Sequence, residues 1–343
     1  MNNNSVSMFV GLDYHLNSVQ VCTMDCQGTI LSNRNCANDW QAIAQSVHRH
    51  GTTVRAAIES CAGAANLAEQ LVSLAGWSVH MAHPGYVRRM KQNPDKTDYS
   101  DARMLADLER VGYLPRVWMA PESVRELRKM VRYRQQLVAE RKNVKLRLTA
   151  ILREHRLFAP SDVGGRWSRR WLKWLRETDG LGPSSRWIAD RHLERLQSVA
   201  SEVKAAEERL TQLTQHDPMV LRLQEHDSIG PVTSWVMRAM IGRFDRFRSG
   251  KQLAHFCGIS PCNTSSGEKQ ADSGMIKAGD GLLRSTLIEA GHRLIRHVER
   301  WRTLAARLQA NGKKPCEIIG AVVNRWMRWL FHQMKEVPMN LPA

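Results

Sequence analysis

The sequence has no run of apolar residues long enough to cross a membrane, and its first residues, Met1–Ser7, lack the basic and apolar segments of a secretory signal peptide. Its seven cysteines are odd in number and widely scattered, which is typical of reduced thiols in a cytosol. Cys22 with Cys26, and Cys257 with Cys262, have no matching second pair at the spacing of a zinc ribbon. We therefore expect a cytoplasmic protein whose cysteines are ordinary thiols.

Acidic residues are in short supply. The 343 residues include 50 Lys and Arg against 33 Asp and Glu, which gives a formal net charge of +17 and an isoelectric point near 10.0. This imbalance favours a polyanionic partner such as nucleic acid, with a basic soluble protein of another kind as the alternative. The chain is long enough for two domains with sizeable cores, joined by a helical connector.

Four carboxylates stand out against this basic background because of their positions. Asp13 and Glu59 each follow or end an apolar run that predicts a strand. Asp98 and Asp101 lie in the segment Lys96–Arg103, where an extended stretch is predicted to turn into a helix. Because they are three residues apart, both can face the same side of that helix.

The first 120 residues alternate between strand and helix patterns. We predict strands at Met8–Leu12, Val19–Met24 and Thr29–Cys36, a helix to about His48, a strand ending at Glu59, a helix at Ala64–Leu74, a strand at Trp77–Ala82 and helical residues after Pro84. This is the order of ribonuclease-H-like α/β folds, which places the end of the first strand beside the end of the fourth. Asp13 and Glu59 would meet there.

Four like charges crowded together are costly unless a cation lies between them. The pattern therefore predicts a divalent-metal site, built from Asp13, Glu59, Asp98 and Asp101, for cutting nucleic acid. For any one of the four, the simpler interpretation is an ordinary turn residue or an acidic residue in the first turn of a helix.

The middle of the chain is basic and helical. Residues 125–156 carry eleven Lys and Arg against three Glu, and this one-sided excess favours contacts with a phosphate backbone over a merely solvated face. Trp167, Trp171 and Trp174 follow at helical spacing among basic residues. They have two interpretations: a stripe that packs into a core, or rings that stack on unpaired bases of RNA.

A break at residues 180–185 precedes a short heptad-like seam, which predicts either an antiparallel helical hairpin or a dimer contact. The seam consists of Leu196, Val199, Val203, Ala206, Leu210 and Leu213. From about Asp217 the chain is predicted to be mainly helical. Ser228–Thr233 is similar to the loop of a helix-hairpin-helix, whose N–H groups grip phosphate. Arg293–Arg328, with nine basic residues and two acidic ones, predicts a second surface for a phosphate backbone.

Together these motifs resemble the insertion-sequence-110 family of transposases, the DEDD transposases related to the Piv invertase, over nearly the whole chain. The motifs that carry the resemblance are Gly11-Leu12-Asp13, Ile58-Glu59, Lys96–Arg103, Phe244–Phe247, Phe256–Pro261, Ser266-Gly267, Lys277–Gly279, Leu283-Arg284 and Asn311–Lys314. The paired-Asp block and the downstream block are specific in combination.

The resemblance implies a RuvC-like N-terminal domain that binds Mg²⁺ through the four carboxylates. It also implies a C-terminal transposase domain with a serine nucleophile, which maps onto Ser266, and a structured noncoding guide (bridge) RNA that pairs with donor and target DNA. His226-Asp227-Ser228 departs from the family's usual Pro-Gly hairpin, and Cys262-Asn263 stands where basic residues are common.

The residues alone do not single out Ser266, because Thr264–Gly267 is composed like a flexible turn and no His lies close by in sequence to act as a base. Ser265 is a competitor one position away. We expect three parts: a catalytic domain at residues 1–122, a basic coiled-coil connector at 123–216 and a transposase domain at 217–343. A homo-oligomer, dimer or tetramer, is expected.

Three functions compete. The first is an RNA-guided recombinase that cuts and joins DNA by transesterification through Ser266; this needs no ATP, and the sequence has no phosphate-binding loop ending in Lys-Ser or Lys-Thr. The second is a hydrolytic junction-resolving nuclease that uses the same carboxylates with water. The third is a nucleic-acid-binding protein without catalysis, which would tolerate neutral residues at all four acidic positions.

Overall fold

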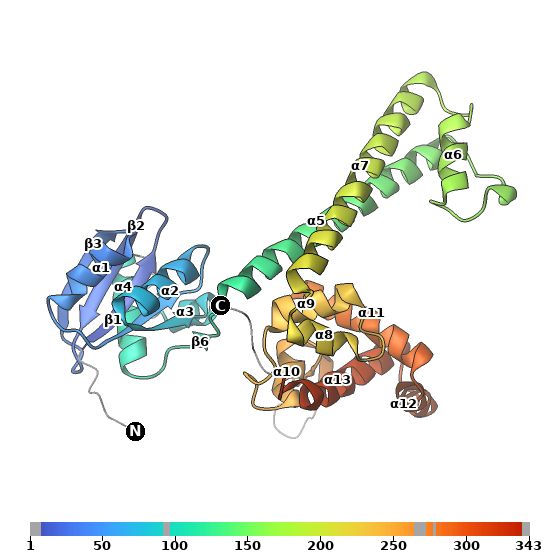
Figure 1. Cartoon of the computed structure of the whole chain (residues 1–343). Coiled ribbons are helices and arrows are strands. Elements are labelled where there is room, and N and C mark those ends of the chain that lie inside the picture. The colour runs from blue at the N-terminus through green and yellow to red at the C-terminus, as the bar shows by residue number, and fades with distance from the viewer. Residues whose placement is uncertain (1–7, 92–96, 264–271, 277–278, 338–343) are drawn as a thin grey trace. The chain divides into compact units, whose positions relative to one another are not determined.

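The computed structural model describes residues 8–91, 97–263, 272–276 and 279–337 (Figure 1). The chain divides into two compact units, residues 1–120 and residues 121–343. Among the described residues, no helix combines the length and the apolar character that a membrane span requires.

The first unit is built on a six-stranded sheet with strand order β3-β2-β1-β4-β5-β6. β1 is antiparallel to β2 and parallel to β4, and β4 is parallel to β5. The strands are β1 (Met8–Tyr14), β2 (Ser18–Met24), β3 (Ile30–Ala37), β4 (Val54–Glu59), β5 (Ser78–Ala82) and β6 (Arg116–Val117). The first five were predicted, and the ends of β1 and β4 are adjacent as expected. Asp13 lies within β1 rather than after it, because pairing with β2 continues to Tyr14.

Helices cover both faces of this sheet: α1 (Trp40–His48), α2 (Ala64–Ala75), α3 (Pro84–Met90) and α4 (Asp98–Arg110). Side chains alternate between the two faces of a strand, so Val10 and Leu12 pack with α1 and α2. Phe9 points to the opposite face, where it packs against Ala102 and Ala106 of α4. The parity of β1 therefore assigns its odd-numbered residues to the face that α4 covers.

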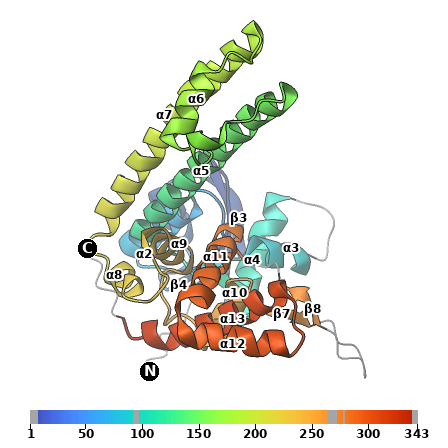
Figure 2. The ribbon, with the colours of Figure 1, turned by 90° about the vertical axis from the view of Figure 1, so that its right-hand side faces the viewer.

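The second unit begins with two long helices that pack against each other, α5 (Glu122–Glu154) and α7 (Pro183–Thr214), as Figures 1 and 2 show. The predicted seam is buried from Leu196 to Leu210 and packs on α5 within the chain. The seam prediction was wrong at Leu213, which is 42% exposed. Thr214 is buried in its place and accepts a hydrogen bond from Trp235 Nε1 at 2.9 Å.

A short 3₁₀ turn, η1 (Ser161–Val163), and α6 (Arg169–Glu177) connect the two long helices. Trp171 is buried there, and Trp167 and Trp174 pack against the same cluster, with ring centroids 4.6 and 5.8 Å from that of Trp171. The core interpretation therefore holds for Trp171. Trp167 precedes the helix and has a positive φ of 70°, so the three rings do not form one helical stripe.

The rest of the second unit is mainly helical, as predicted. It contains α8 (Pro218–Gln224), α9 (Pro231–Ile241), α10 (Gly250–Phe256), α11 (Gly281–His297), α12 (Glu299–Ala310) and α13 (Pro315–Met334), with a small hairpin of β7 (Pro261–Asn263) and β8 (Asp272–Met275). α13 is the centre of this core: Val322, Val323, Met327 and Leu330 on it are fully enclosed.

Candidate metal centre and nucleic-acid interface

Strand parity brings Asp13 and Glu59 to the same end and the same face of the sheet. Leu12 of β1 pairs with Ile58 of β4, so the next residues along the two parallel strands are Asp13 and Glu59. Ala57, two residues before Glu59, packs against α4. Both carboxylates therefore share the face that α4 covers.

The start of α4 presents the other two acidic residues. Thr97 is the N-cap, and it forms a capping box with Ser100, so the sequence itself fixes where the helix begins. Asn33 of β3 donates a hydrogen bond from Nδ2 to the backbone oxygen of Tyr99 at 3.0 Å, which ties this end of the helix to the sheet. Asp101 is buried, and Asp98 is exposed at the helix start.

A glycine permits this close approach of helix and sheet. A Cβ atom on residue 11 would lie 1.8 Å from the backbone oxygen of Ala102 and 2.6 Å from the backbone nitrogen of Ala106. Only glycine fits at this position of β1, two residues before Asp13. Gly63, the N-cap of α2, also favours glycine, because its φ is 92° and a Cβ there would meet the hydroxyl of Tyr14 at the end of β1.

His15 links Asp13 to Asp98. Its Nε2 lies 3.3 Å from Asp13 Oδ2 and 3.2 Å from Asp98 Oδ2. One ligand atom from each of the three residues lies within 4.8 Å of the others, which is compact enough to hold a single metal ion.

Asp101 is held by a cation from the neighbouring helix. Lys91, at the C-terminal end of α3, places Nζ 2.5 Å from Asp101 Oδ1. His15 and Lys91 therefore contact three of the four carboxylates.

The surroundings of Asp13 disfavour the charged form of its carboxyl group. Burial raises the pKa of Asp13 above its ordinary value; the charge of His15 opposes the rise, while the charges of Asp101 and Asp98 add to it. The thiol of Cys61 lies near Glu59. Burial raises the pKa of this thiol and a hydrogen bond from the Ala64 backbone lowers it, while the charges of Glu59 and Asp13 raise it further. Asp13 therefore interacts with the charges of both Asp98 and Asp101, and Glu59 lies near enough to act on the same thiol.

The structure thus places Asp13 and Asp98 close together, and Asp101 is near enough for its charge to act on Asp13. Glu59 lies at the end of the adjacent strand. The compact three-residue group contains His15 in place of Glu59 and Asp101. Sequence reasoning missed both His15 and Lys91. A histidine two residues after the first aspartate was a usable signal for His15, because residues 13 and 15 lie on one face of a strand. No sequence pattern marks Lys91.

Ser265 and Ser266 lie outside the described residues. The segments on either side of them pair as β7 and β8. Residues of the recognised motifs support this hairpin: Asn324 Nδ2 of α13 donates to the backbone oxygen of Ile259 at 3.2 Å. Arg246 packs over the rings of Phe247 and Phe256 at 4.2 and 4.5 Å, and burial lowers the pKa of its guanidinium to about 10.

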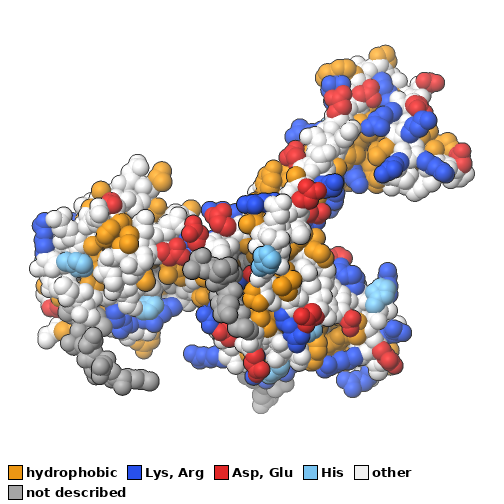
Figure 3. Space-filling model, viewed as in Figure 1, with side chains coloured by type: hydrophobic (Ala, Val, Ile, Leu, Met, Phe, Trp, Pro, Cys, Tyr) orange, Lys and Arg blue, Asp and Glu red, His pale blue; other side chains and the backbone are white. Residues whose placement is uncertain are grey.

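The basic helices offer surfaces for phosphates. On α5, part of the positive charge is neutralised within the hairpin, since Arg134 pairs with Glu207 of α7 and Glu140 with Arg195. Within the described part of the chain, Arg141, Lys142 and Arg147 have no carboxylate partner. Figure 3 shows Lys and Arg side chains around α6 and over the part of the second unit where α12 lies.

Comparisons with known proteins give one family. Residues 10–156 match a family model for DEDD transposases of the IS110 type, described as "Transposase", and residues 220–306 match one described as "Transposase IS116/IS110/IS902 family". Together the two matches cover more than half of the chain.

Individual relatives agree with these matches. The transposase for insertion sequence element IS1111A of Coxiella burnetii is 22% identical over 84% of this chain and 78% of its own length. A probable family 20 transposase of Pseudomonas aeruginosa is 24% identical over 84% of both chains. The transposase for insertion sequence element IS1328 of Yersinia enterocolitica is 24% identical over 71% of both.

Proposed function

This chain belongs to the IS110 family of transposases, and we propose that it cuts and rejoins DNA strands at a metal site formed by Asp13, Glu59, Asp98 and Asp101. The observation that carries the proposal is the crowding of Asp13, Asp98 and Asp101 at the point where α4 meets β1. A site with this many carboxylates in one place is intrinsically unfavourable without a cation.

The donor set fits a hard divalent ion. Carboxylate oxygens are the ligands that Mg²⁺ prefers, and a cation would offset the charges of Asp98 and Asp101, which add to the effect of burial in raising the pKa of Asp13. His15 contacts Asp13 and Asp98 and can itself serve as a ligand, whereas Lys91 pairs with Asp101 and has to move aside or share this carboxylate when a metal is bound. A bound Mg²⁺ would supply stabilisation of the negative charge that develops on the phosphoryl oxygens.

The nucleophile that we propose is the hydroxyl of Ser266. Its oxygen attacks the phosphorus of the scissile phosphodiester, a serine–phosphate bond forms and the bond to the 3′ oxygen breaks. The proton lost from the serine is balanced by the one that the 3′ oxygen gains. The 3′ hydroxyl of a partner strand then attacks the same phosphorus and releases the serine. Each step exchanges one phosphodiester for another, so no ATP is consumed.

We propose that a structured guide RNA selects the DNA. Recognition of a paired heteroduplex needs contacts to the phosphate backbone rather than to base edges. The excess of basic residues on α5 suits that task. The same proposal includes an oligomer, a RuvC-like, ribonuclease-H-like fold for the first unit, and the division of the chain near residues 122 and 216.

The carboxylates are tested by replacing each with its amide in the full-length protein. Asp13→Asn, Glu59→Gln, Asp98→Asn and Asp101→Asn should each lower Mg²⁺-dependent strand cleavage by about 100-fold or more, because each removes charge or a ligand that contributes several kcal/mol. Binding of nucleic acid should persist. The matched control is Asp107→Asn, on the same helix but paired with Arg110 and away from the cluster.

Two outcomes would refute the metal site: cleavage that survives EDTA, or full activity in any two of the four variants. If instead the carboxylates are essential but Ser266→Ala still cleaves, water is the nucleophile and the enzyme acts as a hydrolase.

A further inference from the structure

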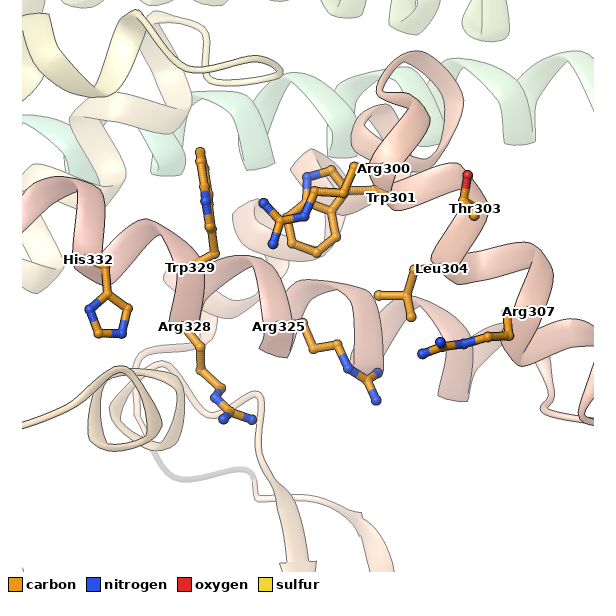
Figure 4. A pocket seen from close by; sticks show the side chains of 9 residues that line it. All are labelled: Arg300, Trp301, Thr303, Leu304, Arg307, Arg325, Arg328, Trp329 and His332. Carbon is orange, nitrogen blue, oxygen red and sulfur yellow. The ribbon is translucent and has the colours of Figure 1, made fainter.

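α12 and α13 line an open cavity of about 650 Å³ on the surface of the second unit (Figure 4). Arg300 and Arg307 are seven positions apart on α12, and Arg325 and Arg328 are three positions apart on α13. At these spacings the side chains of each helix share one face. Figure 4 shows Arg307 and Arg325 extending toward each other from the two helices.

The lining of the cavity carries a strong positive charge. All four arginines are exposed, and none has a carboxylate partner among the residues that the structure describes. Glu317, at the start of α13, accepts a hydrogen bond from the Lys314 backbone at 3.1 Å and pairs with Lys313. Four unpaired guanidiniums along two helices exceed what one phosphate can engage, so they suit a chain of phosphates.

The wall of the cavity is aromatic. Trp301 is buried, Trp329 is half-buried, and the guanidinium of Arg300 lies 4.9 and 5.6 Å from their ring centroids. A ring beside a guanidinium offers two flat surfaces on which a base can stack. Paired bases inside a duplex cannot enter such a recess, whereas an unpaired base can.

We propose that this cavity binds a single-stranded segment of nucleic acid, with one unpaired base against Trp329 and the flanking phosphates on Arg307, Arg325 and Arg328. The inference rests on the proposed function only in taking nucleic acid as the ligand. It assigns to α12 and α13 the recognition of a strand, which is distinct from strand cleavage.

The test measures binding of a fluorescein-labelled 12-nucleotide RNA, of a DNA strand of the same sequence and of the matching DNA duplex to the full-length protein. The variant Arg307→Ala/Arg325→Ala/Arg328→Ala should weaken single-strand binding by about tenfold or more, and lower the log–log salt slope by about 2, because each lost phosphate contact contributes about 0.7. Duplex binding should change much less. Whichever single strand, RNA or DNA, loses more affinity in the variant is the strand that the cavity binds.

The matched control is Arg191→Ala/Arg222→Ala/Arg243→Ala. It removes the same charge at arginines that are each paired with a neighbouring carboxylate, of which Arg191 is exposed and Arg222 and Arg243 are partly buried. An equal loss in both triple variants would overturn the proposal, because it would show that only net charge matters. Equal loss for duplex and single strand would overturn it as well.

Trp329 provides a second test. With 2-aminopurine in the oligonucleotide, Trp329→Leu should abolish the quenching of its fluorescence and weaken binding about fivefold, whereas Trp329→Phe should retain both. Thermal melting of both variants checks that the fold persists. If Trp329→Leu melts like the parent and still quenches, no base stacks there. Because these assays need no cleavage, failure of the metal site or of Ser266 would leave their result unchanged.

Discussion

Gly11 and Ala102 meet with their backbones in direct contact. The backbone oxygen of Ala102 occupies the place where a side chain on residue 11 would begin, 1.8 Å from the position of its Cβ. This contact sets how deeply α4 sits on β1. The distance between Asp13, two residues along β1, and Asp98, four residues back along α4, depends on it.

Gly11→Ala should therefore damage both stability and the site. Overpacking in a core costs about 1–3 kcal/mol, and a collision with backbone rather than with a flexible side chain belongs at or above the top of that range. We expect a loss of about 3 kcal/mol in the free energy of unfolding, measured in urea, and weaker Mg²⁺ binding by calorimetry. Gly165→Ala, where a Cβ meets nothing within 4 Å, should have little effect. Unchanged stability in Gly11→Ala would show that α4 can shift without cost.

Much of the first unit could be predicted from sequence because its signals are local. Apolar alternation marks the strands, and Thr97 with Ser100 marks the start of α4. The adjacency of β1 and β4 followed from the order of the elements. His15 and Lys91 could not be derived in this way, since their roles depend on how α3 and α4 approach the sheet edge. The seam failed at Leu213 for a similar reason: α9 contributes Trp235, which selects Thr214 as the buried residue.

Lys91 competes with a metal ion for Asp101. Lys91→Met keeps the aliphatic stem but removes the ammonium group, so Asp101 loses the cation that is paired with it. We expect the affinity for Mg²⁺ to rise about fivefold, equivalent to about 1 kcal/mol, in isothermal titration calorimetry. Lys129→Met, which breaks the exposed pair with Glu126 on α5, is the control. Weaker Mg²⁺ binding in Lys91→Met would mean that the lysine supports the site rather than competes for it.

Glu109 stabilises the first unit through its charge. Its carboxylate is fully buried and accepts hydrogen bonds from Arg55 at 2.5 Å and Arg116 at 2.8 Å, with His80 at 3.1 Å. Burial raises the pKa of Glu109, but the hydrogen bond and charge of His80, with those of the arginines, outweigh burial and hold it below its ordinary value of 4.5. Glu109→Gln should cost about 2–3 kcal/mol at neutral pH, because it leaves these basic groups without their anion.

The sign of the pH dependence follows from the lowered pKa. The stabilising effect of Glu109 is complete above the pKa of the unfolded chain and is lost as the pH falls through the lower pKa of the folded state. The gap in unfolding free energy between the parent and Glu109→Gln should therefore narrow below about pH 4.5. Glu126→Gln, at an exposed pair, should show no such trend. A gap that widens in acid would contradict the assignment.

Of Trp167, Trp171 and Trp174, Trp171 is the one that is buried in the core. It is 4% exposed and packs against Leu148, Leu152 and Leu193 in one cluster. Trp171→Ala should lower the free energy of unfolding by about 3–5 kcal/mol. Trp167→Leu is the comparison, since that ring is only half-buried and lies beneath Lys145 and Arg166 at 5.0 and 5.3 Å. If Trp167→Leu weakens RNA binding at an unchanged melting temperature, that ring stacks on a base.

The serine makes the last and most direct prediction: Ser266 becomes covalently joined to DNA during the reaction. A serine hydroxyl is a poor nucleophile at neutral pH. We expect charge stabilisation at the phosphate to lower the barrier, so adduct formation should require both the metal and the carboxylates.

A nicked substrate that traps the intermediate should give a protein–DNA adduct, visible as a shifted band on a denaturing gel and assigned by peptide mass. The adduct should be absent in Ser266→Ala and in Asp98→Asn, and present in Ser265→Ala. Loss in Asp98→Asn separates a metal-dependent nucleophile from a serine that merely lies close to DNA. An adduct on Ser265 would move the nucleophile by one position. If Ser266→Ala recombines DNA without any adduct, the Ser266 hydroxyl is not the nucleophile, and the attack is assigned to water.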